Sequence, residues 1–422
     1  MHSVTNAIPT GTIASIPAKA HAHRALICAA LANSPSTILL SRTSKDIDAT
    51  MDSLRGLGAH VIYKNNIVTV TPGPVPAKGN VVPHESGTTL RLLLPVAASI
   101  CNDVDVDAKG RLPDRPLEPM LSEMKAHGVT FSQDKPPFTM TGRLQSGNFS
   151  MVGDVSSQFF SGLLLAAPQI GLSTITATTP LQSSDYVTLT TETMRDFGVE
   201  VEHTLPDTNI NEAFTVPFGA SFIGRDNYQI EGDWSNAAIW MVAAGMTGKP
   251  ITITGMNKNS VQADRRIMQV MIDAGCDVVW DGMNITVTGR ASKPIHADLE
   301  QMPDMLPVMA ALACSIQGES AFVKGARLRL KESDRLIAVA NLVRDLGGTV
   351  REEGDDLYII GSGILKGGHG DCVNDHRLVM AGTLMALISE NSVTLKDSEA
   401  ITKSYPDFFE DWNLLGGDAH GI

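Results

Sequence analysis

The sequence predicts an α/β protein made of two similar lobes with three repeat units each, and a ligand site in the cleft between the lobes. The first observation is a six-fold internal repeat with a period of about 70 residues. The second is that every copy joins an Ala-rich apolar stretch to an amphipathic stretch that ends in glycine. The third is the β-branched run that follows most of these glycines. One such copy cannot bury its own apolar face, so the copies should stack into large pseudo-symmetric bodies.

The amphipathic half of each copy is predicted to be a helix that stops at a glycine. These halves read MDSLRGLGAHV, LSEMKAHGVTF, TETMRDFGVEV, MQVMIDAGCDV, VANLVRDLGGTV and the truncated DWNLLGGD. Only glycine takes the left-handed conformation just beyond a helix end without a Cβ penalty. We therefore expect left-handed residues at the closing glycines, which are Gly58, Gly128, Gly198, Gly275, Gly348 and Gly417.

The apolar half of each copy is predicted to be a helix, and the segments after the glycines are predicted to be strands. The apolar halves include ALICAALA, LRLLLPVAASI, FFSGLLLAAPQI and MLPVMAALACSI. The later segments include VIYKNNIVTV, VVWDGMNITV and VREEGDDLYII, whose centres KNN, DGMN and EGDD are typical of hairpin turns.

Three copies precede about residue 230 and three follow it. The N-terminal strand could pair with either lobe, and the stretch GRDNYQIEGDW is expected to be the second crossing. We therefore predict one discontinuous lobe of residues 1–17 plus 232–422 and a second lobe of residues 18–231.

Composition and charge exclude several classes of function. The formal net charge of −13 argues against binding to nucleic acid or to anionic membranes. The apolar stretches run for about 12–15 residues, fewer than the ~20 that a membrane span needs. The five cysteines form no CxxC pair, and the N-terminus has no secretory pattern. We therefore expect a cytoplasmic monomer with buried thiols that acts on small molecules.

Seven basic residues recur at matching phases of different copies, several of them at predicted helix starts. A cation at a helix N-terminus is opposed by the helix dipole unless an anion shares the site. Cations that converge without a ligand would repel one another, so the expected ligands carry several negative charges, as phosphates and carboxylates do. The seven are Lys19, Arg24, Arg115, Lys331, Arg335, Arg377 and Lys403.

Polar residues open further helices, and two acidic residues are candidates for proton transfer. The polar tracts are Ser86–Gly87–Thr88–Thr89, Ser156–Ser157–Gln158 and Ser183–Ser184–Asp185–Tyr186, although N-capping alone would also explain such residues. Asp304 precedes an apolar helix and could be its N-cap or a general base. Glu332, beside Lys331, could be an ion-pair partner or a proton shuttle.

Motifs for metal or nucleophilic chemistry do not occur. The sequence has no HExxH, no Cys/His cluster at ligand spacing, no GxSxG and no GxxxxGK[ST]. We therefore expect neither a metal nor an organic cofactor, and we expect His376 to orient or pack rather than to act as a nucleophile.

In this order, the motifs resemble the 5-enolpyruvylshikimate-3-phosphate synthase (3-phosphoshikimate 1-carboxyvinyltransferase) family over nearly the whole chain. The matching tracts are KxxxHRAL, SGTTLR, VSSQF, SxxY, KESDR, DHR and KSYPDF. The resemblance implies two lobes of three βαβαββ units that close on substrate. It also implies transfer of the enolpyruvyl group of phosphoenolpyruvate to the 5-hydroxyl of shikimate 3-phosphate with release of phosphate, without a cofactor, in aromatic amino acid biosynthesis.

The resemblance assigns roles by motif position. Phosphoenolpyruvate would be held by Lys19, Gly87, Arg115, Gln158, Arg335, Arg377 and Lys403. Shikimate 3-phosphate would be held by Lys19, Arg24, Ser156, Ser157, Gln158, Ser183, Tyr186, Asp304 and Lys331. Asp304 would be the base on the attacking hydroxyl, and Glu332 with Lys19 would transfer the proton at C3. Gly87 would leave room beside the phosphoenolpyruvate pocket, so inhibition by glyphosate is expected.

Several positions depart from the family pattern. Ala20 stands where the family usually has a Ser that contacts the shikimate substrate, and Glu85 stands where many members have Asn. Arg327 replaces a polar amide and could compensate for Ala20. The alternatives are a catalytically weak homologue that binds shikimate-like anions, and UDP-N-acetylglucosamine enolpyruvyl transferase. The latter has a Cys-bearing loop where this chain has residues 110–116 without Cys.

Overall fold

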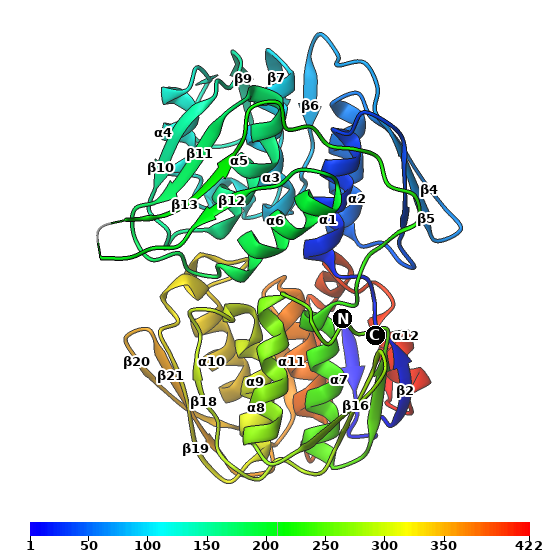
Figure 1. The fold of residues 1–422 in the computed structure, drawn as a ribbon. Coiled ribbons are helices and arrows are strands. Elements are labelled where there is room, and N and C mark those ends of the chain that lie inside the picture. Colours follow the sequence, from blue (N-terminus) through cyan, green and yellow to red (C-terminus); the bar gives the residue numbers. More distant parts are fainter. Residues whose placement is uncertain (209) are drawn as a thin grey trace. The chain divides into compact units, whose positions relative to one another are not determined.

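Each repeat of the chain forms one four-stranded sheet and two helices (Figure 1). The computed structural model describes residues 1–208 and 210–422. In these residues the strands form six four-stranded sheets with the same pattern of pairing. From one edge of each sheet, the first two strands are parallel, and the third and fourth strands are each antiparallel to the strand before them. The predicted α/β class is confirmed.

The chain divides into two units, which we call the continuous unit (Pro17–Ile230) and the split unit (Met1–Ile16 with Glu231–Ile422). Each unit contains three of the sheets.

The continuous unit contains the first three pairs of helices. These are α1 (Lys19–Ala30), α2 (Lys45–Gly56), α3 (Gly87–Ile100), α4 (Met120–Ala126), α5 (Ser157–Ile170) and α6 (Asp185–Asp196). Its sheets, in spatial order, are β14 (Tyr228–Gln229), β3 (Ser36–Leu39), β5 (Ile67–Thr71), β4 (His60–Lys64); β6 (Gly79–Val81), β7 (Asp103–Val106), β9 (Phe138–Thr141), β8 (Thr130–Phe131); and β10 (Gly147–Met151), β11 (Ser173–Ala177), β13 (Glu212–Val216), β12 (Glu202–Thr204).

The split unit repeats this arrangement with the other three pairs of helices. These are α7 (Trp234–Thr247), α8 (Ile267–Asp273), α9 (Leu306–Ser315), α10 (Arg335–Asp345), α11 (His376–Ala386) and α12 (Phe408–Leu414). Its sheets are β2 (Gly11–Ala14), β15 (Ile251–Thr254), β17 (Asn284–Thr288), β16 (Asp277–Asp281); β18 (His296–Asp298), β19 (Gly318–Val323), β21 (Asp356–Gly361), β20 (Thr349–Glu353); and β22 (Gly368–Asp371), β23 (Val393–Lys396), β1 (His2–Val4), β24 (Ala419–Gly421).

The leading strands of two repeats are exchanged where the chain passes between the units. Strand β2 precedes α1 in the chain but pairs in parallel with β15, so that Ile13 lies opposite Ile253. Strand β14 precedes α7 but pairs in parallel with β3, so that Tyr228 lies opposite Ile38. The N-terminal strand β1 lies between β23 and β24 and completes the last sheet of the split unit.

The first helix of each repeat is buried almost all round. In α3, for example, every residue from Leu90 to Ser99 is buried, and α7, α9 and α11 are buried to a similar extent. Their Ala and Gly residues allow close packing: a Cβ on Gly162 of α5 would come within 2.5 Å of the Arg91 carbonyl oxygen in α3. These helices form the core of their unit, and the sheets of the same unit pack on them.

The helix-stop prediction is confirmed in four repeats and wrong by one residue in two. Gly58, Gly128, Gly198 and Gly275 have positive φ values of 104°, 95°, 88° and 99°. In the last two repeats Gly347 and Gly416, with φ of 88° and 92°, take this conformation instead of Gly348 and Gly417. In every repeat the left-handed glycine lies two residues beyond the last helical residue, so the first glycine of a tandem pair fills the position.

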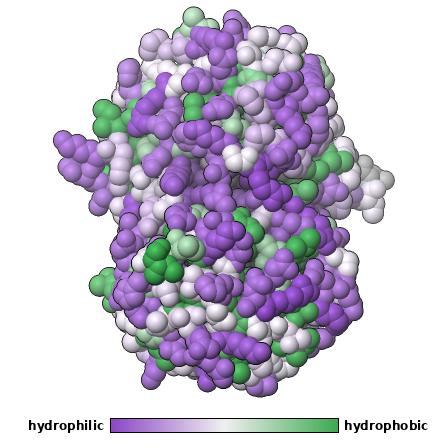
Figure 2. Space-filling view, turned by 180° about the vertical axis from the view of Figure 1, so that it is seen from behind, coloured by the Kyte–Doolittle hydropathy of each residue, from purple (hydrophilic) through white to green (hydrophobic). Residues whose placement is uncertain are grey.

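Polar side chains dominate the face shown in Figure 2, where apolar side chains occur only in small scattered groups. The five cysteines are buried and form no disulfide. Among the described helices, none combines the length and the apolar character that crossing a membrane would need.

Candidate active site

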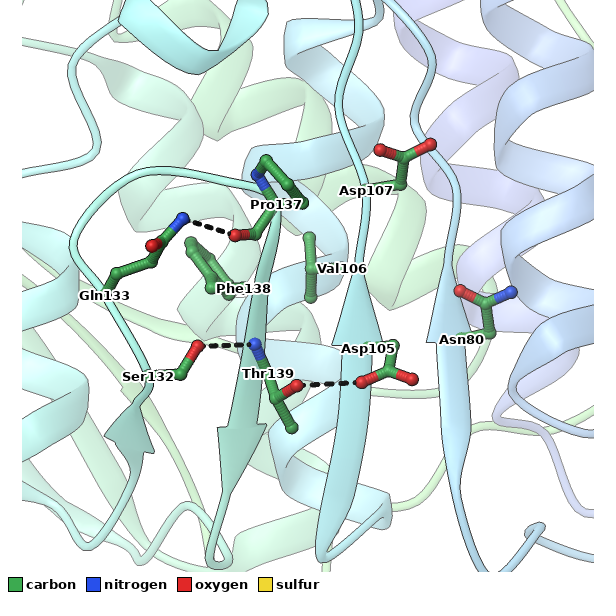
Figure 3. A pocket seen from close by; sticks show the side chains of 9 residues that line it. All are labelled: Asn80, Asp105, Val106, Asp107, Ser132, Gln133, Pro137, Phe138 and Thr139. Carbon is green, nitrogen blue, oxygen red and sulfur yellow. Dashed lines mark hydrogen bonds between the residues drawn. The ribbon is translucent and has the colours of Figure 1, made fainter.

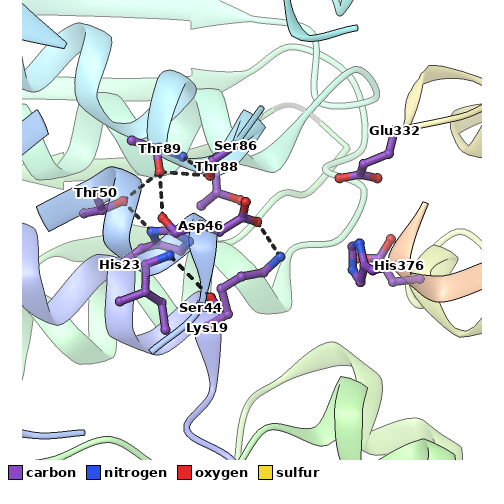
Figure 4. Close-up of polar contacts among 12 residues, drawn as sticks. Lys19, His23, Ser44, Asp46, Thr50, Ser86, Thr88, Thr89, Glu332 and His376 are labelled. Atoms are coloured by element: carbon purple, nitrogen blue, oxygen red, sulfur yellow. Dashed lines mark hydrogen bonds and ion pairs between the residues drawn. The ribbon is translucent and has the colours of Figure 1, made fainter. Parts of the chain in front are cut away.

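The start of α1 brings Lys19 against Asp46, the second residue of α2 (Figure 4). Lys19 Nζ lies 2.7 Å from an Asp46 carboxylate oxygen, and the two side chains are only 19% and 14% exposed. A cation in the first turn of a helix is opposed by the helix dipole. Asp46 supplies a compensating negative charge, a role that sequence analysis missed because the partners are 27 residues apart.

The N-terminus of α3 places its first residue, Gly87, directly beside Arg115. A Cβ built on Gly87 would lie 2.5 Å from Arg115 Nη1 and 2.8 Å from its Cζ. The missing side chain therefore makes room for a guanidinium at the N-terminus of α3, where backbone N–H groups also favour anions. Ser86 is the N-cap of this helix, since its Oγ accepts a hydrogen bond from Thr89 N at 3.2 Å.

Gln158, in the first turn of α5, is held at both ends of its amide. Its Nε2 donates to Thr88 Oγ1 at 2.9 Å, and its Oε1 accepts from Arg91 Nη1 at 3.0 Å. Arg91 also donates to the Pro116 carbonyl at 3.0 Å. Arg91 thus determines how the amide is oriented, although sequence analysis gave it no role within SGTTLR.

Ser156 and Ser157 lie at the start of the same helix, with 6% and 3% of their surface exposed. Ser156 is the N-cap of α5, because its Oγ accepts from Gln158 N at 3.3 Å. The capping alternative is therefore correct for Ser156, and its role in holding a substrate stays a prediction.

Arg24 lies inside the continuous unit with 1% exposure. Its guanidinium donates to Thr190 Oγ1 at 2.7 Å, to the Ala20 and Tyr186 carbonyls at 2.7 and 2.9 Å, and to Ser161 Oγ at 3.2 Å. Burial lowers the pKa of Arg24 to about 10, while Tyr186 opposes that shift. Arg24 therefore joins α1, α5 and α6, and its predicted contact with shikimate 3-phosphate stays a prediction.

Ser183 precedes α6 with a positive φ of 54° and is 2% exposed, and Tyr186 lies in the first turn of α6. Tyr186 N donates to the Ser183 carbonyl at 3.1 Å. The two predicted residues therefore share one turn.

Arg335 is the centre of a charged cluster in the split unit. Its Nε and Nη2 bind the two oxygens of Asp375 at 2.8 and 3.2 Å, its Nη1 binds Asp304 at 2.6 Å, and its Nη2 also binds Glu332 at 2.5 Å. Arg335 is 1% exposed and Asp375 is fully buried. Burial opposes the positive charge, but Asp375, Glu332 and Asp304 outweigh it and raise the pKa of Arg335 above its ordinary value.

Asp304 lies in the 3-10 helix η3 (Pro303–Met305) and faces three cations. Its carboxylate is 2.6 Å from Arg335 Nη1, 3.1 Å from Lys331 Nζ and 3.4 Å from Arg377 Nη2. Burial favours the neutral acid, but the three cations outweigh it and hold the pKa of Asp304 well below its usual range. The N-cap alternative is wrong for Asp304, because the N-cap of α9 is Met305, without a side-chain cap.

The start of α11 brings Arg377 and Lys403 to the segment that carries Asp375. Asp375 is the N-cap of α11 and accepts from Arg377 N at 3.0 Å. The preceding residue, Asn374, accepts a hydrogen bond from Lys403 Nζ at 2.8 Å through its carbonyl oxygen. His376, the first residue of α11, is 2% exposed, which agrees with an orienting or packing role.

Arg327 lies in the 3-10 helix η4 (Ala326–Leu330), close to Lys331. Burial lowers the pKa of Lys331 to about 8; Asp304 opposes this shift, and the positive charge of Arg327 adds to it. Arg327 therefore belongs to the charged cluster of the split unit.

One premise of the sequence analysis is wrong. It required an anionic ligand because converging cations would repel one another. In the structure, carboxylates of the chain already balance several of these cations: Asp46 pairs with Lys19, and Asp304, Glu332 and Asp375 surround Arg335. The contacts of Asp46, Asp304 and Asp375 join residues that are distant in sequence, so local patterns did not indicate them, whereas Glu332 lies three residues from Arg335 and was expected as an ion-pair partner.

The predicted residues thus form two clusters, one in each unit, and a single site that draws on both stays a prediction. A separate hollow of about 340 Å³ lies on the sheet of β6, β7, β9 and β8, where Asp105 accepts a hydrogen bond from Thr139 Oγ1 at 2.8 Å (Figure 3). None of the predicted site residues lines this hollow.

A family model described as EPSP synthase (3-phosphoshikimate 1-carboxyvinyltransferase) matches residues 7–412. The chain belongs to the EPSP synthase family. It is 36% identical over 413 residues to the 3-phosphoshikimate 1-carboxyvinyltransferase of Clostridium kluyveri, covering 97% of this chain and 95% of the relative. It is 35% identical over 418 residues to that of Methanocorpusculum labreanum, covering 97% of each.

The fold of this EPSP synthase family member also matches a solved structure. EPSP synthase from Acinetobacter baumannii superposes with a TM-score of 0.82 at 22% sequence identity, covering 100% of this chain and 99% of the other. The two proteins therefore share the fold along their whole length.

Proposed function

We propose that this chain transfers the enolpyruvyl group of phosphoenolpyruvate to the 5-hydroxyl of shikimate 3-phosphate and releases phosphate. The observation that carries the proposal is the Asp304 cluster: a carboxylate and three cations within 3.4 Å, beside Glu332, in a member of this family. A base, a proton donor and anion-binding groups are what the reaction needs.

The proposed function assigns residues of both clusters to the two substrates. Phosphoenolpyruvate binds Lys19, Gly87, Arg115, Gln158, Arg335, Arg377 and Lys403. Shikimate 3-phosphate binds Lys19, Arg24, Ser156, Ser157, Gln158, Ser183, Tyr186, Asp304 and Lys331. The cations in both groups and the anionic groups of both substrates support this assignment.

In the proposed reaction Asp304 removes the proton of the 5-hydroxyl of shikimate 3-phosphate. At the same time the oxygen of that hydroxyl bonds to C2 of phosphoenolpyruvate. Glu332, with Lys19, delivers a proton to C3. The tetrahedral adduct then loses phosphate from C2 and a proton from C3, which restores the double bond. In this structure Asp304 is a weak base, because Lys331, Arg377 and Arg335 stabilise its charge. Substrate anions that bind these cations would reduce this stabilisation and raise the basicity of Asp304.

The decisive experiment measures inorganic phosphate released from phosphoenolpyruvate with and without shikimate 3-phosphate. Release that depends on shikimate 3-phosphate supports the proposal. Calorimetric binding of shikimate 3-phosphate without release would favour the weak-homologue alternative, for which Ala20 is the motivating departure. Release that requires UDP-N-acetylglucosamine instead would favour the alternative that the chain is a UDP-N-acetylglucosamine enolpyruvyl transferase.

We expect the kcat/KM for shikimate 3-phosphate to fall as the pH rises above about 8. The pKa of Lys331 is lowered to about 8, so its ammonium, which is proposed to bind the substrate, loses its proton above that pH. The profile of kcat/KM reports the free enzyme and should fall by up to about tenfold per pH unit. Lys331→Arg keeps the charge and should move this fall to higher pH; an unchanged profile in Lys331→Arg would contradict the assignment.

Restoring a hydroxyl at position 20 is expected to lower the KM for shikimate 3-phosphate. One added hydrogen bond to a charged group is worth about 1.5–3 kcal/mol, so Ala20→Ser should lower KM by about tenfold or more. Ala20→Gly is the control that adds no hydroxyl. An unchanged KM in Ala20→Ser would indicate that another group, such as Arg327, already fills this role.

The net charge also bears on where the protein works and what it binds. The formal net charge of −13 supports an enzyme that binds small molecules rather than nucleic acid or membranes. We propose that it works in the cytoplasm as a monomer. Light scattering of the purified protein would test its oligomeric state.

A further inference from the structure

Three helices of the continuous unit begin at or next to residues of the proposed site. Two of these residues are proposed to bind phosphoenolpyruvate, and the third pairs with one of them. Lys19 is the first residue of α1, Asp46 the second of α2, and Gly87 the first of α3. The placement of these groups therefore depends on how the three helix starts are held against one another.

A continuous chain of hydrogen bonds runs through the first two turns of these helices (Figure 4). His23 Nδ1 is 2.6 Å from Thr50 Oγ1, and Thr50 Oγ1 is 2.7 Å from Thr89 Oγ1. Thr89 Oγ1 has two acceptors within reach of its single proton, Ser86 Oγ at 2.9 Å and the Asp46 carbonyl oxygen at 3.3 Å. The chain thus connects α1, α2 and α3 one turn or less beyond Lys19, Asp46 and Gly87.

The side chains of this network are shielded from solvent. His23, Thr50 and Thr89 have no exposed surface, and Ser86 is 2% exposed. The proposed function assigns none of these four residues to a substrate, so their expected effect on the reaction passes through the groups that they hold.

The direction of the hydrogen bonds follows from the number of protons. Once Thr89 gives its single hydroxyl proton to Ser86 or to the Asp46 carbonyl, Thr50 must donate to Thr89, and His23 must donate from Nδ1 to Thr50. Nε2 of His23 has no partner among the described residues, so a proton there would be a buried N–H without an acceptor. A neutral imidazole with its proton on Nδ1 avoids this. The opposite direction would leave a buried N–H without an acceptor, which proteins avoid more strictly.

The surroundings favour the same neutral imidazole. Burial is the main cause that lowers the pKa of His23 well below its ordinary value, and the positive charges of Lys19 and Arg24 on the same helix add to it.

We propose that the chain His23–Thr50–Thr89–Ser86 is a positioning network that holds the starts of α1, α2 and α3 in the arrangement that presents Lys19 and Gly87 to phosphoenolpyruvate. Thr50 is its central residue. A relative shift of any of the three helices would leave a buried hydroxyl or the imidazole unsatisfied, so the network resists such shifts. The inference rests on the proposed function, because phosphoenolpyruvate is the ligand of that function.

The test compares Thr50→Val, Thr50→Ser and Thr193→Val. Thr50→Val keeps the shape and breaks the chain, whereas Thr50→Ser keeps the hydroxyl. Thr193 in α6 of the same unit is 1% exposed and its hydroxyl donates only within its own helix, to the Leu189 carbonyl at 2.7 Å. Thr193→Val therefore controls for the loss of a buried threonine hydroxyl outside the network.

We expect Thr50→Val to raise the KM for phosphoenolpyruvate by about tenfold with a much smaller change in kcat. Thr50→Ser should restore most of the affinity, and Thr193→Val should leave KM near the wild-type value. Equal KM values for Thr50→Val and Thr193→Val would overturn the proposal, as would a Thr50→Val defect that Thr50→Ser fails to relieve.

A second measurement does not depend on activity. Nitrogen-15 NMR of histidine-labelled protein, with the His23 signals assigned from a His23→Asn sample, reports the tautomer. The network predicts neutral imidazole with the proton on Nδ1 between about pH 5 and 8, and a changed tautomer ratio in Thr50→Val. A proton on Nε2, or titration of His23 in this range, would overturn the network. Wild-type protein that releases no phosphate would instead contradict the proposed function, while this readout still tests the network.

Discussion

Replacing Arg335 with methionine is expected to lower kcat/KM by roughly 100- to 1,000-fold and to destabilise the split unit by about 3–5 kcal/mol. The guanidinium binds Asp375, Asp304 and Glu332 at once and is 1% exposed. Without it three carboxylates, one of them fully buried, lose a shared positive charge. Leaving a buried charge without its partner is among the most destabilising single changes. The same substitution would also remove the group that aligns Asp304, the proposed base, and Glu332, the proposed proton donor.

Phosphate release and urea unfolding measure the two effects of Arg335→Met. Arg329→Met is the matched control, because Arg329 pairs with Asp334 at 3.2 Å and Asp355 at 2.8 Å but is 33% exposed. Such exposed pairs contribute about 1 kcal/mol or less. Arg335→Lys separates charge from geometry, since an ammonium cannot reach all three carboxylates in a fixed fork. If Arg335→Met were no less stable than Arg329→Met, the buried cluster would not have the importance assigned to it.

Gly87→Ala is expected to raise the KM for phosphoenolpyruvate roughly tenfold to 100-fold. The added methyl group would lie 2.5 Å from Arg115 Nη1, so the guanidinium must move. Overpacking of this kind costs about 1–3 kcal/mol, and here it would be expressed as displacement of a proposed ligand-binding group. The KM for shikimate 3-phosphate should change less, because Gly87 is assigned only to phosphoenolpyruvate.

A double-mutant cycle with Arg115→Lys tests whether Gly87→Ala acts through Arg115. Lysine keeps the charge but removes the planar fork against which the methyl group would press. The two changes should therefore be strongly non-additive in KM. Inhibition by glyphosate, which is expected for the wild type, should weaken in Gly87→Ala because the methyl group would displace Arg115. Additive effects, or a rise in the KM for shikimate 3-phosphate alone, would contradict the proposed role of Gly87.

The sequence by itself determined the features that depend on neighbours along the chain. Helix-period apolar stretches, hairpin turns and closing glycines specified the repeats, because these signals act within one turn or one hairpin. The error at Gly348 and Gly417 is of the same local kind: each belongs to a tandem pair, and the helix end selects Gly347 or Gly416. The motifs at helix starts also indicated the family, which the matches along the chain confirm.

Only the tertiary structure decided which strands complete which sheets and which charges meet. Strands β2 and β14 join sheets far along the chain, and no local pattern distinguishes such a strand from one that pairs with its neighbour. Likewise Asp46 and Asp375 balance cations that sequence analysis treated as needing a ligand, and Arg24 is held by α5 and α6. Pairings across long stretches of chain depend on how the buried helices pack, and residue spacing carries no information about that packing.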